Sequence, residues 1–395
     1  MQSRLSSGTG SDLLKDNGWI FFWLFIGIVF NSISSYVTLF SFTLLIAREI
    51  FRNRFSINTR GAFFLLVCTL SLFCWSGVSS GLVTNHNAMW LFFLSTLSYM
   101  VGAVLAKRFD NPPHLYYAIF ILFLILALPN IPITLYDIYS NGLVNPERQL
   151  SVLGDGEQHS TTGRTVELCM AIAGICMVFI TSKNQFQLRT RRLYIILALI
   201  AELCTLHYVS RTGISVFLIA FILGFLIKGR NDSKILYILL FGLLVYYFFE
   251  ATTLGDLFRS REIEGSSVAD AGGRTDRWLI GFLMMINNPH GYTYGIDYWY
   301  AHNFWLDFGR EGGLYAFIAL SFFSVIILWK SYIIAKNKTI PDYLSKSLFL
   351  FSICIFITLF TEAVHNGAQM LMYVYFIFSG IIMEYEKRNR IKTIH

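Results

Sequence analysis

The stretch SRTGISVFLIAFILGFLI (residues 210–227) sets an arginine directly before a long apolar run, in which residues 212–227 contain no Asp, Glu, Lys or Arg. A helix that crosses a lipid bilayer needs about 20 mostly apolar residues. Similar runs recur along the chain, whereas a membrane β-barrel would show short strands of alternating hydrophobicity. The sequence therefore predicts an all-α, polytopic integral membrane protein.

The composition of the whole chain supports this prediction. Of its 395 residues, 55% are hydrophobic and only 14% are charged, and the mean hydropathy is +0.56. Soluble domains carry about 25% charged residues. The net charge of +7 does not indicate binding to nucleic acid, because most Lys and Arg residues fall in short loops, where they orient membrane helices.

Twelve runs have the length and hydropathy of membrane spans, at 18–32, 35–49, 61–82, 88–106, 115–136, 165–182, 192–209, 212–228, 233–251, 313–331, 346–363 and 367–385. Residues 18–49 could also form one tilted helix, although the run from Asn31 to Ser35 is typical of a turn. With the N-terminus in the cytoplasm, Lys and Arg gather in the cytoplasmic loops and the C-terminal tail, whereas loops 83–87 and 364–366 contain neither. We therefore predict that both termini are cytoplasmic.

Residues 1–395 are predicted to form a single membrane domain. Two of its outer loops, at 137–164 and 252–312, are much longer than the others. Arg211 lies beside them at the turn 210–212, and the loops themselves hold Arg148, Arg164, Arg259, Arg261, Arg274, Arg277 and Arg310. A guanidinium group is a planar fork of five donors that stays charged when partly desolvated, so clustered arginines suit a phosphate ligand. The alternative is that they contact phospholipid headgroups or pair with Glu262, Glu264 and Asp276.

The stretch GGRTDRWLIGFLMMINNPHGYTYG (272–295) predicts a short amphipathic helix that begins after Gly273 and ends at Asn287-Asn288-Pro289. Arg274 and Arg277 are three residues apart and share a face of this helix. Arg274 also falls in the first turn, where backbone N–H groups favour anions. The bilayer surface is expected to contact the aromatic and apolar positions Trp278, Phe282 and Met285.

A histidine follows in DYWYAHNFWLDFGREGGLYAFI (297–318). Imidazole titrates at about pH 6.5, so His302 is a candidate general base for a hydroxyl group, although a lone histidine is more often structural. Its aromatic neighbours could stack on sugar rings or form an interfacial belt. Glu202 lies within a predicted span near His207, and it is either functional or part of a satisfied buried pair.

The sequence predicts neither a metal site nor a cofactor. All six cysteines fall in apolar runs without a CxxC pair, and the loop carboxylates show no metal-ligand spacing. The chain also lacks the motifs of phosphate-binding loops, zinc proteases and serine hydrolases.

The stretches at 210–227, 272–295 and 302–318, in this order and spacing, resemble the O-antigen polymerase/O-antigen ligase superfamily. The resemblance implies a metal-independent, inverting glycosyltransferase of the all-helical, GT-C-like membrane type. Its donors are glycans on undecaprenyl diphosphate, and its site faces the periplasm from the bacterial inner membrane. The expected partners are these lipid-linked glycans and membrane lipids; the resemblance also admits a chain-length regulator protein, but no nucleic acid.

The resemblance also assigns roles to residues of this chain. His302 matches the histidine that deprotonates the acceptor hydroxyl, and Asn303 its supporting neighbour. Arg211 and Arg274 match arginines that bind the diphosphate, with Arg277 on the same face as Arg274. Two further residues match more loosely, Arg148 in the smaller outer loop and Arg261 before Gly272, and Glu202 is expected to support the site from its span.

Polymerase is the first expectation for the function, since the ligase pattern expects Gly, Thr or Tyr where this chain has Ala316. The alternative within the superfamily is a ligase that transfers polysaccharide to lipid A-core. A transporter or flippase is the alternative from another class. It would carry charges along a path through many helices, whereas Glu202 is the main charge expected within a span here.

Overall fold

The computed structural model describes residues 8–32, 34–53, 59–145, 149–150, 159–160, 165–170, 172–173, 188–227, 242–243, 246, 250, 252, 255–256, 274–292, 301–362 and 369–394. Its elements are α1 (Gly8–Val29), η1 (Phe30–Ser32), α2 (Ser35–Asn53), α3 (Arg60–Ser79), α4 (Asn85–Arg108), α5 (Pro112–Ala127), α6 (Asn130–Asn141), β1 (Gln149–Leu150), β2 (His159–Ser160), α8 (Leu188–His207), α9 (Arg211–Ile227), α12 (Arg274–Asn287), α13 (Phe304–Lys336), α14 (Asp342–Thr361) and α16 (Gln369–Ile394). The described part is helical apart from the short antiparallel pair β1–β2, which confirms the predicted all-α class.

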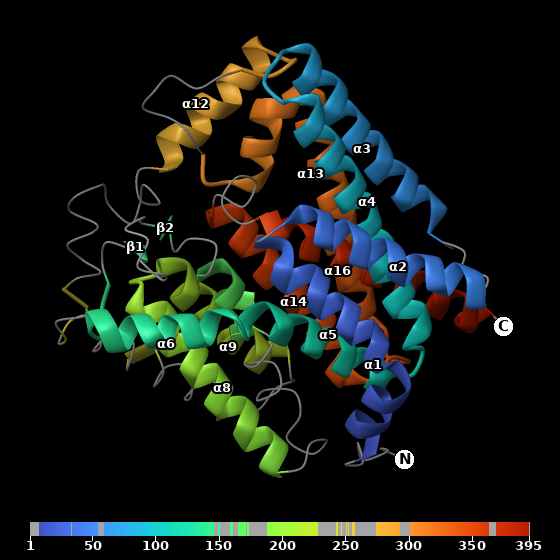
Figure 1. The fold of residues 1–395 in the computed structure, drawn as a ribbon, viewed down its shortest axis with the longest axis vertical. Coiled ribbons are helices and arrows are strands. Elements are labelled where there is room, and N and C mark those ends of the chain that lie inside the picture. The colour runs from blue at the N-terminus through green and yellow to red at the C-terminus, as the bar shows by residue number, and fades with distance from the viewer. Residues whose placement is uncertain are drawn as a thin grey trace.

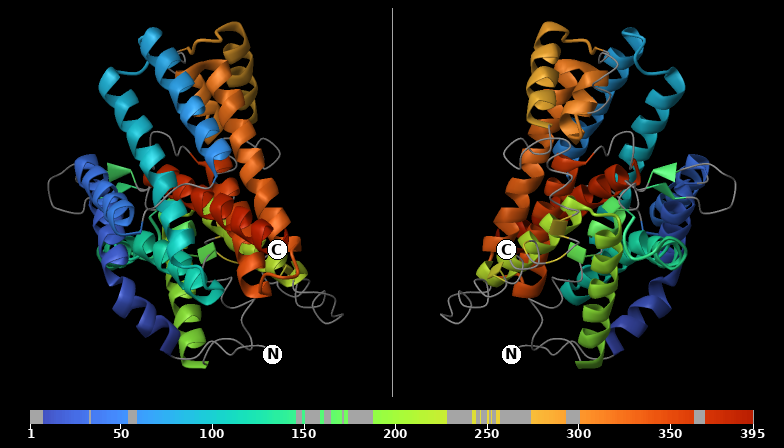
Figure 2. Two further views of the ribbon diagram at one scale, coloured as in Figure 1. Left: turned by 90° about the vertical axis from the view of Figure 1, so that its right-hand side faces the viewer. Right: turned by 90° about the vertical axis from the view of Figure 1, so that its left-hand side faces the viewer.

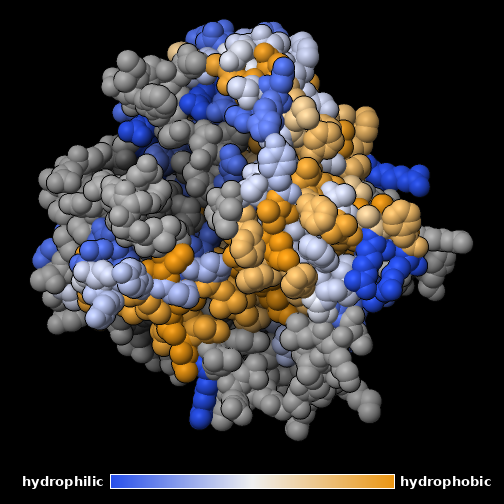
Figure 3. Space-filling view, in the orientation of Figure 1, coloured by the Kyte–Doolittle hydropathy of each residue, from blue (hydrophilic) through white to orange (hydrophobic). Residues whose placement is uncertain are grey.

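Several described helices are long and apolar enough to cross a membrane. There are five, at Arg60–Ser79, Asn85–Arg108, Pro112–Asn141, Phe304–Lys336 and Asp342–Thr361. Figure 3 shows a broad apolar area over the described helices on one face of the molecule, which agrees with a membrane protein. The number of twelve spans stays a prediction, since α1, α2, α8, α9 and α16 are not among these five. The spans expected at 165–182 and 233–251 lie largely outside the described residues.

The first predicted pair of spans is two helices. α1 and α2 are separated by η1, and the hydroxyl of Thr38 in α2 donates to Gly27 O (2.7 Å) and to Asn31 Oδ1 (2.8 Å). These bonds close the turn across the chain, so the interpretation of Asn31 to Ser35 as a turn is confirmed.

The predicted span 115–136 lies within the candidate membrane span Pro112–Asn141. It is divided into α5 and α6 at Leu128 and Pro129. Proline lacks the N–H that an uninterrupted helix requires, while Leu128 and Pro129 both keep right-handed helical φ and ψ. α6 therefore continues beyond the predicted end of the span, to Asn141, and carries Asp137.

Helices α4, α13 and α16 run in the same direction. Their carboxyl-terminal halves are tied by the ion pairs Lys107–Glu384 (3.7 Å) and Lys330–Glu386 (3.0 Å). α16 lies so close to α4 that a Cβ atom on Gly102 would overlap the backbone of Ile377. This central group fixes the amino ends of α4 and α13 at the opposite end of the molecule.

That opposite end holds the turn between α3 and α4, the start of α13 and the whole of α12 (Figure 1). The two side views in Figure 2 show the same segments side by side. The predicted outer loop 252–312 thus contributes α12 and the first turns of α13 to one end of the helical bundle.

Candidate functional site

Three parts of the chain meet where α14 ends. Arg274, the first residue of α12, donates a hydrogen bond from Nη1 to the carbonyl oxygen of Thr361. Thr212, the second residue of α9, donates from its hydroxyl to Oε1 of Glu362, whose residue is only 4% exposed. Carbonyl groups at a helix end lack helical partners, so the end of α14 provides an acceptor that fixes the Arg274 side chain.

The charges at this meeting point are predominantly positive. Burial lowers the pKa of Arg274, Glu362 acts in the opposite direction, and the nearby charges of Arg211 and Arg277 lower the pKa further. Arg274 thus lies within electrostatic range of two other guanidinium groups and of the Glu362 carboxylate. The excess of positive charge fits an anion with more than one negative charge.

Arg211 begins α9, and the preceding turn holds it at this end of the molecule. Ser210 caps the helix, since its Oγ accepts from the N–H of Gly213 at 3.1 Å. The Arg211 side chain is exposed. Val209, two residues before it, has a φ of 50°, which is uncommon for a β-branched residue and costs free energy.

His302 lies in a short segment held between α12 and α13. Trp278 Nε1 donates to Ala301 O at 2.7 Å, and Ala301 N donates to Asp307 Oδ1 at 2.8 Å. His302 itself has a φ of 52°. Among the described residues other than glycine, only His302 and Val209 have positive φ, so backbone strain occurs at His302 and two residues before Arg211. Such strain gathers at functional sites.

Asn303 has a structural task. Its Oδ1 accepts from the N–H groups of Trp305 (3.1 Å) and Leu306 (3.2 Å) and so caps α13, while Nδ2 lies 3.5 Å from Phe360 O. The cap links the His302 segment to the end of α14, next to the carbonyl that holds Arg274. Asn303 therefore supports the site without being exposed to a ligand.

The helix that carries the predicted span 313–331 begins at Phe304, earlier than expected, and bends at Gly313, where φ is 80°. A Cβ atom at Gly313 would overlap the carbonyl of Pro289, which accepts from Leu314 N at 2.9 Å. The bend therefore packs closely against Pro289, which follows the end of α12. Arg310 pairs with Glu311 at 2.6 Å at the bend, which gives these two charges a local structural explanation.

The predicted helix in 272–295 is confirmed as α12, with the expected start and end. Its expected bilayer face is partly wrong. Met285 is buried and Trp278 is turned towards Ala301, whereas the exposed apolar residues are Leu279, Phe282, Leu283 and Ile286. The indole N–H needs a hydrogen-bond partner, and this requirement turns Trp278 inwards.

Glu202 and His207 do not pair with each other. Thr205 donates to the Glu202 carboxylate at 3.4 Å, whereas His207 Nε2 lies 2.6 Å from Asp137 Oδ2. The remaining predicted residues, Arg148 and Arg261, lie outside the described residues. Within the described part, no group of three His, Cys, Asp or Glu side chains could hold a metal ion.

Sequence reasoning missed Glu362 and Thr212. Glu362 had a usable signal, because it is an acidic residue inside the predicted span 346–363, and ionisable groups within spans are functional candidates. Thr212 had none, since a hydroxyl in an apolar run acquires its role only through the partner it meets.

Comparison with known proteins adds no relative. No protein-family model matches the chain, and no curated protein matches it. The functional interpretation is therefore based on the residues themselves and on their geometry.

Proposed function

We propose that the chain is a membrane glycosyltransferase that joins repeat units carried on undecaprenyl diphosphate at the periplasmic face of the bacterial inner membrane, as an O-antigen polymerase. The observation that carries the proposal is the half-buried guanidinium of Arg274, fixed by Thr361 O and influenced by Arg211 and Arg277. A diphosphate leaving group supplies the multiple negative charge that such a cluster requires.

The arrangement supports a single displacement step. His302 takes the proton of an acceptor hydroxyl, and the oxygen attacks the anomeric carbon of the donor glycan. The bond from this carbon to the diphosphate oxygen breaks as the new bond forms, with inversion at the carbon. The arginines stabilise the charge that gathers on the departing diphosphate, whose bond supplies the driving force without ATP.

The membrane arrangement belongs to the proposal as well. Twelve spans with both termini in the cytoplasm would put the arginine cluster at the outer face. The ion pairs in the carboxyl-terminal halves of α4, α13 and α16 support this orientation, because these halves carry the basic residues expected inside. The exposed apolar residues of α12 support its location in the outer interfacial region.

The proposal is tested with purified protein in nanodiscs and lipid-linked repeat units extracted from the source strain after deletion of the gene. The wild-type protein is expected to release undecaprenyl diphosphate and to form a ladder of longer lipid-linked products. Arg274→Ala should lose most of this activity, whereas Arg52→Ala, which changes an exposed arginine in the last turn of α2, should retain it.

The reaction products also distinguish a polymerase from a ligase and from a transporter. Transfer that requires added lipid A-core would identify a ligase, and flipping of the lipid without glycosyl transfer would identify a transporter. Either result would contradict the polymerase proposal.

A further inference from the structure

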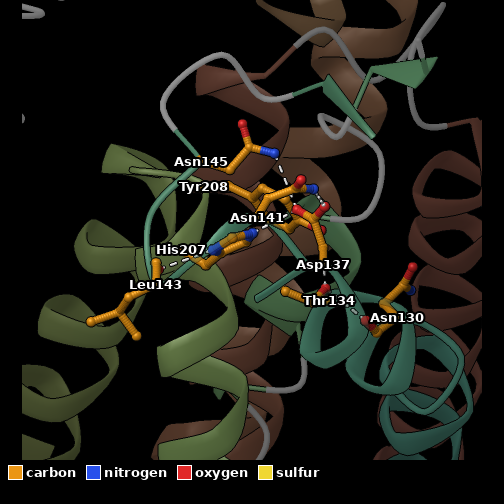
Figure 4. Close-up of polar contacts among 8 residues, drawn as sticks. All are labelled: Asn130, Thr134, Asp137, Asn141, Leu143, Asn145, His207 and Tyr208. Atoms are coloured by element: carbon orange, nitrogen blue, oxygen red, sulfur yellow. Dashed lines mark hydrogen bonds and ion pairs between the residues drawn. The ribbon is translucent and has the colours of Figure 1, made fainter. Parts of the chain in front are cut away.

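A second buried polar centre joins the end of α6 to the end of α8. Asp137 Oδ2 lies 2.6 Å from His207 Nε2, with the side chains 3% and 0% exposed. The other ring nitrogen, Nδ1, lies 3.0 Å from Leu143 O, so that the imidazole sits between the two acceptors (Figure 4). Asn141 and Asn145 also donate to the Asp137 carboxylate, at 2.6 and 3.1 Å.

These contacts define which ring nitrogens of His207 donate hydrogen bonds. A carbonyl oxygen only accepts, so Nδ1 donates a proton to Leu143 O. A carboxylate that accepts from two amide groups is stabilised in its ionised form, so Nε2 donates to Asp137 as well. The centre is therefore an ion pair in which both ring N–H groups of His207 have acceptors. Removal of one partner would leave the other as an uncompensated buried charge. Because both ring nitrogens are occupied, His207 is no candidate for a general base.

The ion pair is connected directly to the turn that precedes Arg211. Asn145 N donates to His207 O at 2.7 Å, and Ser210 N donates to Thr205 O at 3.1 Å. Between them lies Val209 with its φ of 50°. A strained residue keeps such a conformation only where its surroundings over-determine it. The buried pair and its loop contacts provide those surroundings.

We propose that the Asp137–His207 ion pair is a positioning clamp that holds the turn 208–210 in its strained form and so directs Arg211 towards the anion bound by the arginine cluster. The effect on transfer rests on the proposed function, whereas the effect on the turn does not. Asp137 and His207 are positioning residues, because they act through Arg211.

The first test is hydrogen–deuterium exchange on the full-length protein in nanodiscs. Asp137→Asn should speed exchange of the backbone amides in 143–145 and 208–214 by about tenfold or more, as expected when a local contact that prevents opening is lost. Asn130→Ala is the matched control. It removes the Asn130–Glu167 hydrogen bond (2.5 Å) at the other end of α6 and should leave these amides unchanged. Unchanged exchange in Asp137→Asn, or equal loosening in both variants, would overturn the clamp.

A milder variant covers the case in which Asp137→Asn does not fold. Asn145→Ala removes one hydrogen bond to Asp137 and leaves the ion pair in place. It should loosen the same amides to a smaller extent, and no change in its exchange would count against the clamp.

The second test measures transfer by double-mutant cycles. Arg211→Ala alone should lower kcat by about 10–150-fold, the loss of one charge-assisted hydrogen bond. In an Asp137→Asn background the same change should cost much less, because Arg211 is already misplaced, whereas Arg274→Ala should keep its full cost. Multiplicative losses for Asp137 and Arg211 would overturn the positioning role. Absence of transfer in the wild-type protein would instead reject the proposed function, and exchange would still decide on the clamp.

Discussion

Arg274 donates a hydrogen bond from Nη1 to the carbonyl oxygen of Thr361, a residue 87 positions further along the chain. Thr361 is the last residue of α14, so its carbonyl is one of the groups that the helix itself leaves without a partner. A guanidinium group has five N–H donors, and one contact to the backbone leaves others for a ligand. The bond therefore fixes the direction of the Arg274 side chain while the group keeps its capacity to bind an anion.

Replacement of His302 should separate stability from activity. Because φ at His302 is 52°, His302→Gly should relieve about 1–2 kcal/mol of backbone strain, whereas His302→Ala should keep the strain. Both variants should lose transfer, because neither can take the proton of the acceptor. Thermal unfolding in detergent and the transfer assay measure the two effects. Normal transfer in either variant would rule out the role of His302 as the base.

The charge of Glu362 should act on stability and on product binding in opposite directions. Glu362→Gln keeps an acceptor for Thr212 but removes a carboxylate charge that offsets the charge of Arg274. The free energy of unfolding should fall by about 1–3 kcal/mol, since the half-buried Arg274 loses the opposite charge of Glu362. Affinity for undecaprenyl diphosphate should rise, because a repulsive charge is gone, and product inhibition should strengthen. Weaker inhibition would show that Glu362 contributes to binding in another way.

The outward face of α12 should lie in lipid. A spin label at Leu283→Cys, in a variant without native cysteines, should be accessible to oxygen and shielded from a water-soluble nickel reagent. The control is Asp276→Cys, an exposed position in the first turn of the same helix, which should show the reverse. Equal accessibility to the nickel reagent at both positions would remove α12 from the bilayer surface.

The sequence predicts well where local signals decide the structure. The Asn-Asn-Pro run at 287–289 sets the end of α12, because proline acts on the backbone of its own neighbours. The turn after α1 is predicted by another local signal, the Asn and Ser residues of 31–35. Each of these features depends on a few consecutive residues, which a single sequence displays directly.

The remaining features depend on partners distant in the sequence. Nothing near Glu362 announces that it meets Thr212 and Arg274, and nothing near His207 names Asp137 as its partner. The face of α12 was misjudged because hydropathy alone does not reveal that the Trp278 N–H needs Ala301 O. The proximity of Arg211 to Arg274 is predicted only from their common side of the membrane.

The last prediction concerns Arg211 and Arg274, which begin two helices, α9 and α12, and interact electrostatically. If both bind one diphosphate, lysine at either position keeps the charge but loses the planar fork, so each Arg→Lys variant should still be impaired. Each Arg→Ala variant should lose about 10–150-fold in kcat, which corresponds to about 1.5–3 kcal/mol for a charge-assisted hydrogen bond. The double Ala variant should lose less than the product of the two single losses, because partners in one network do not act additively. The assay with purified lipid-linked substrate decides: strictly multiplicative losses would show that the arginines act on separate groups, and fully active lysine variants would reduce their role to charge alone.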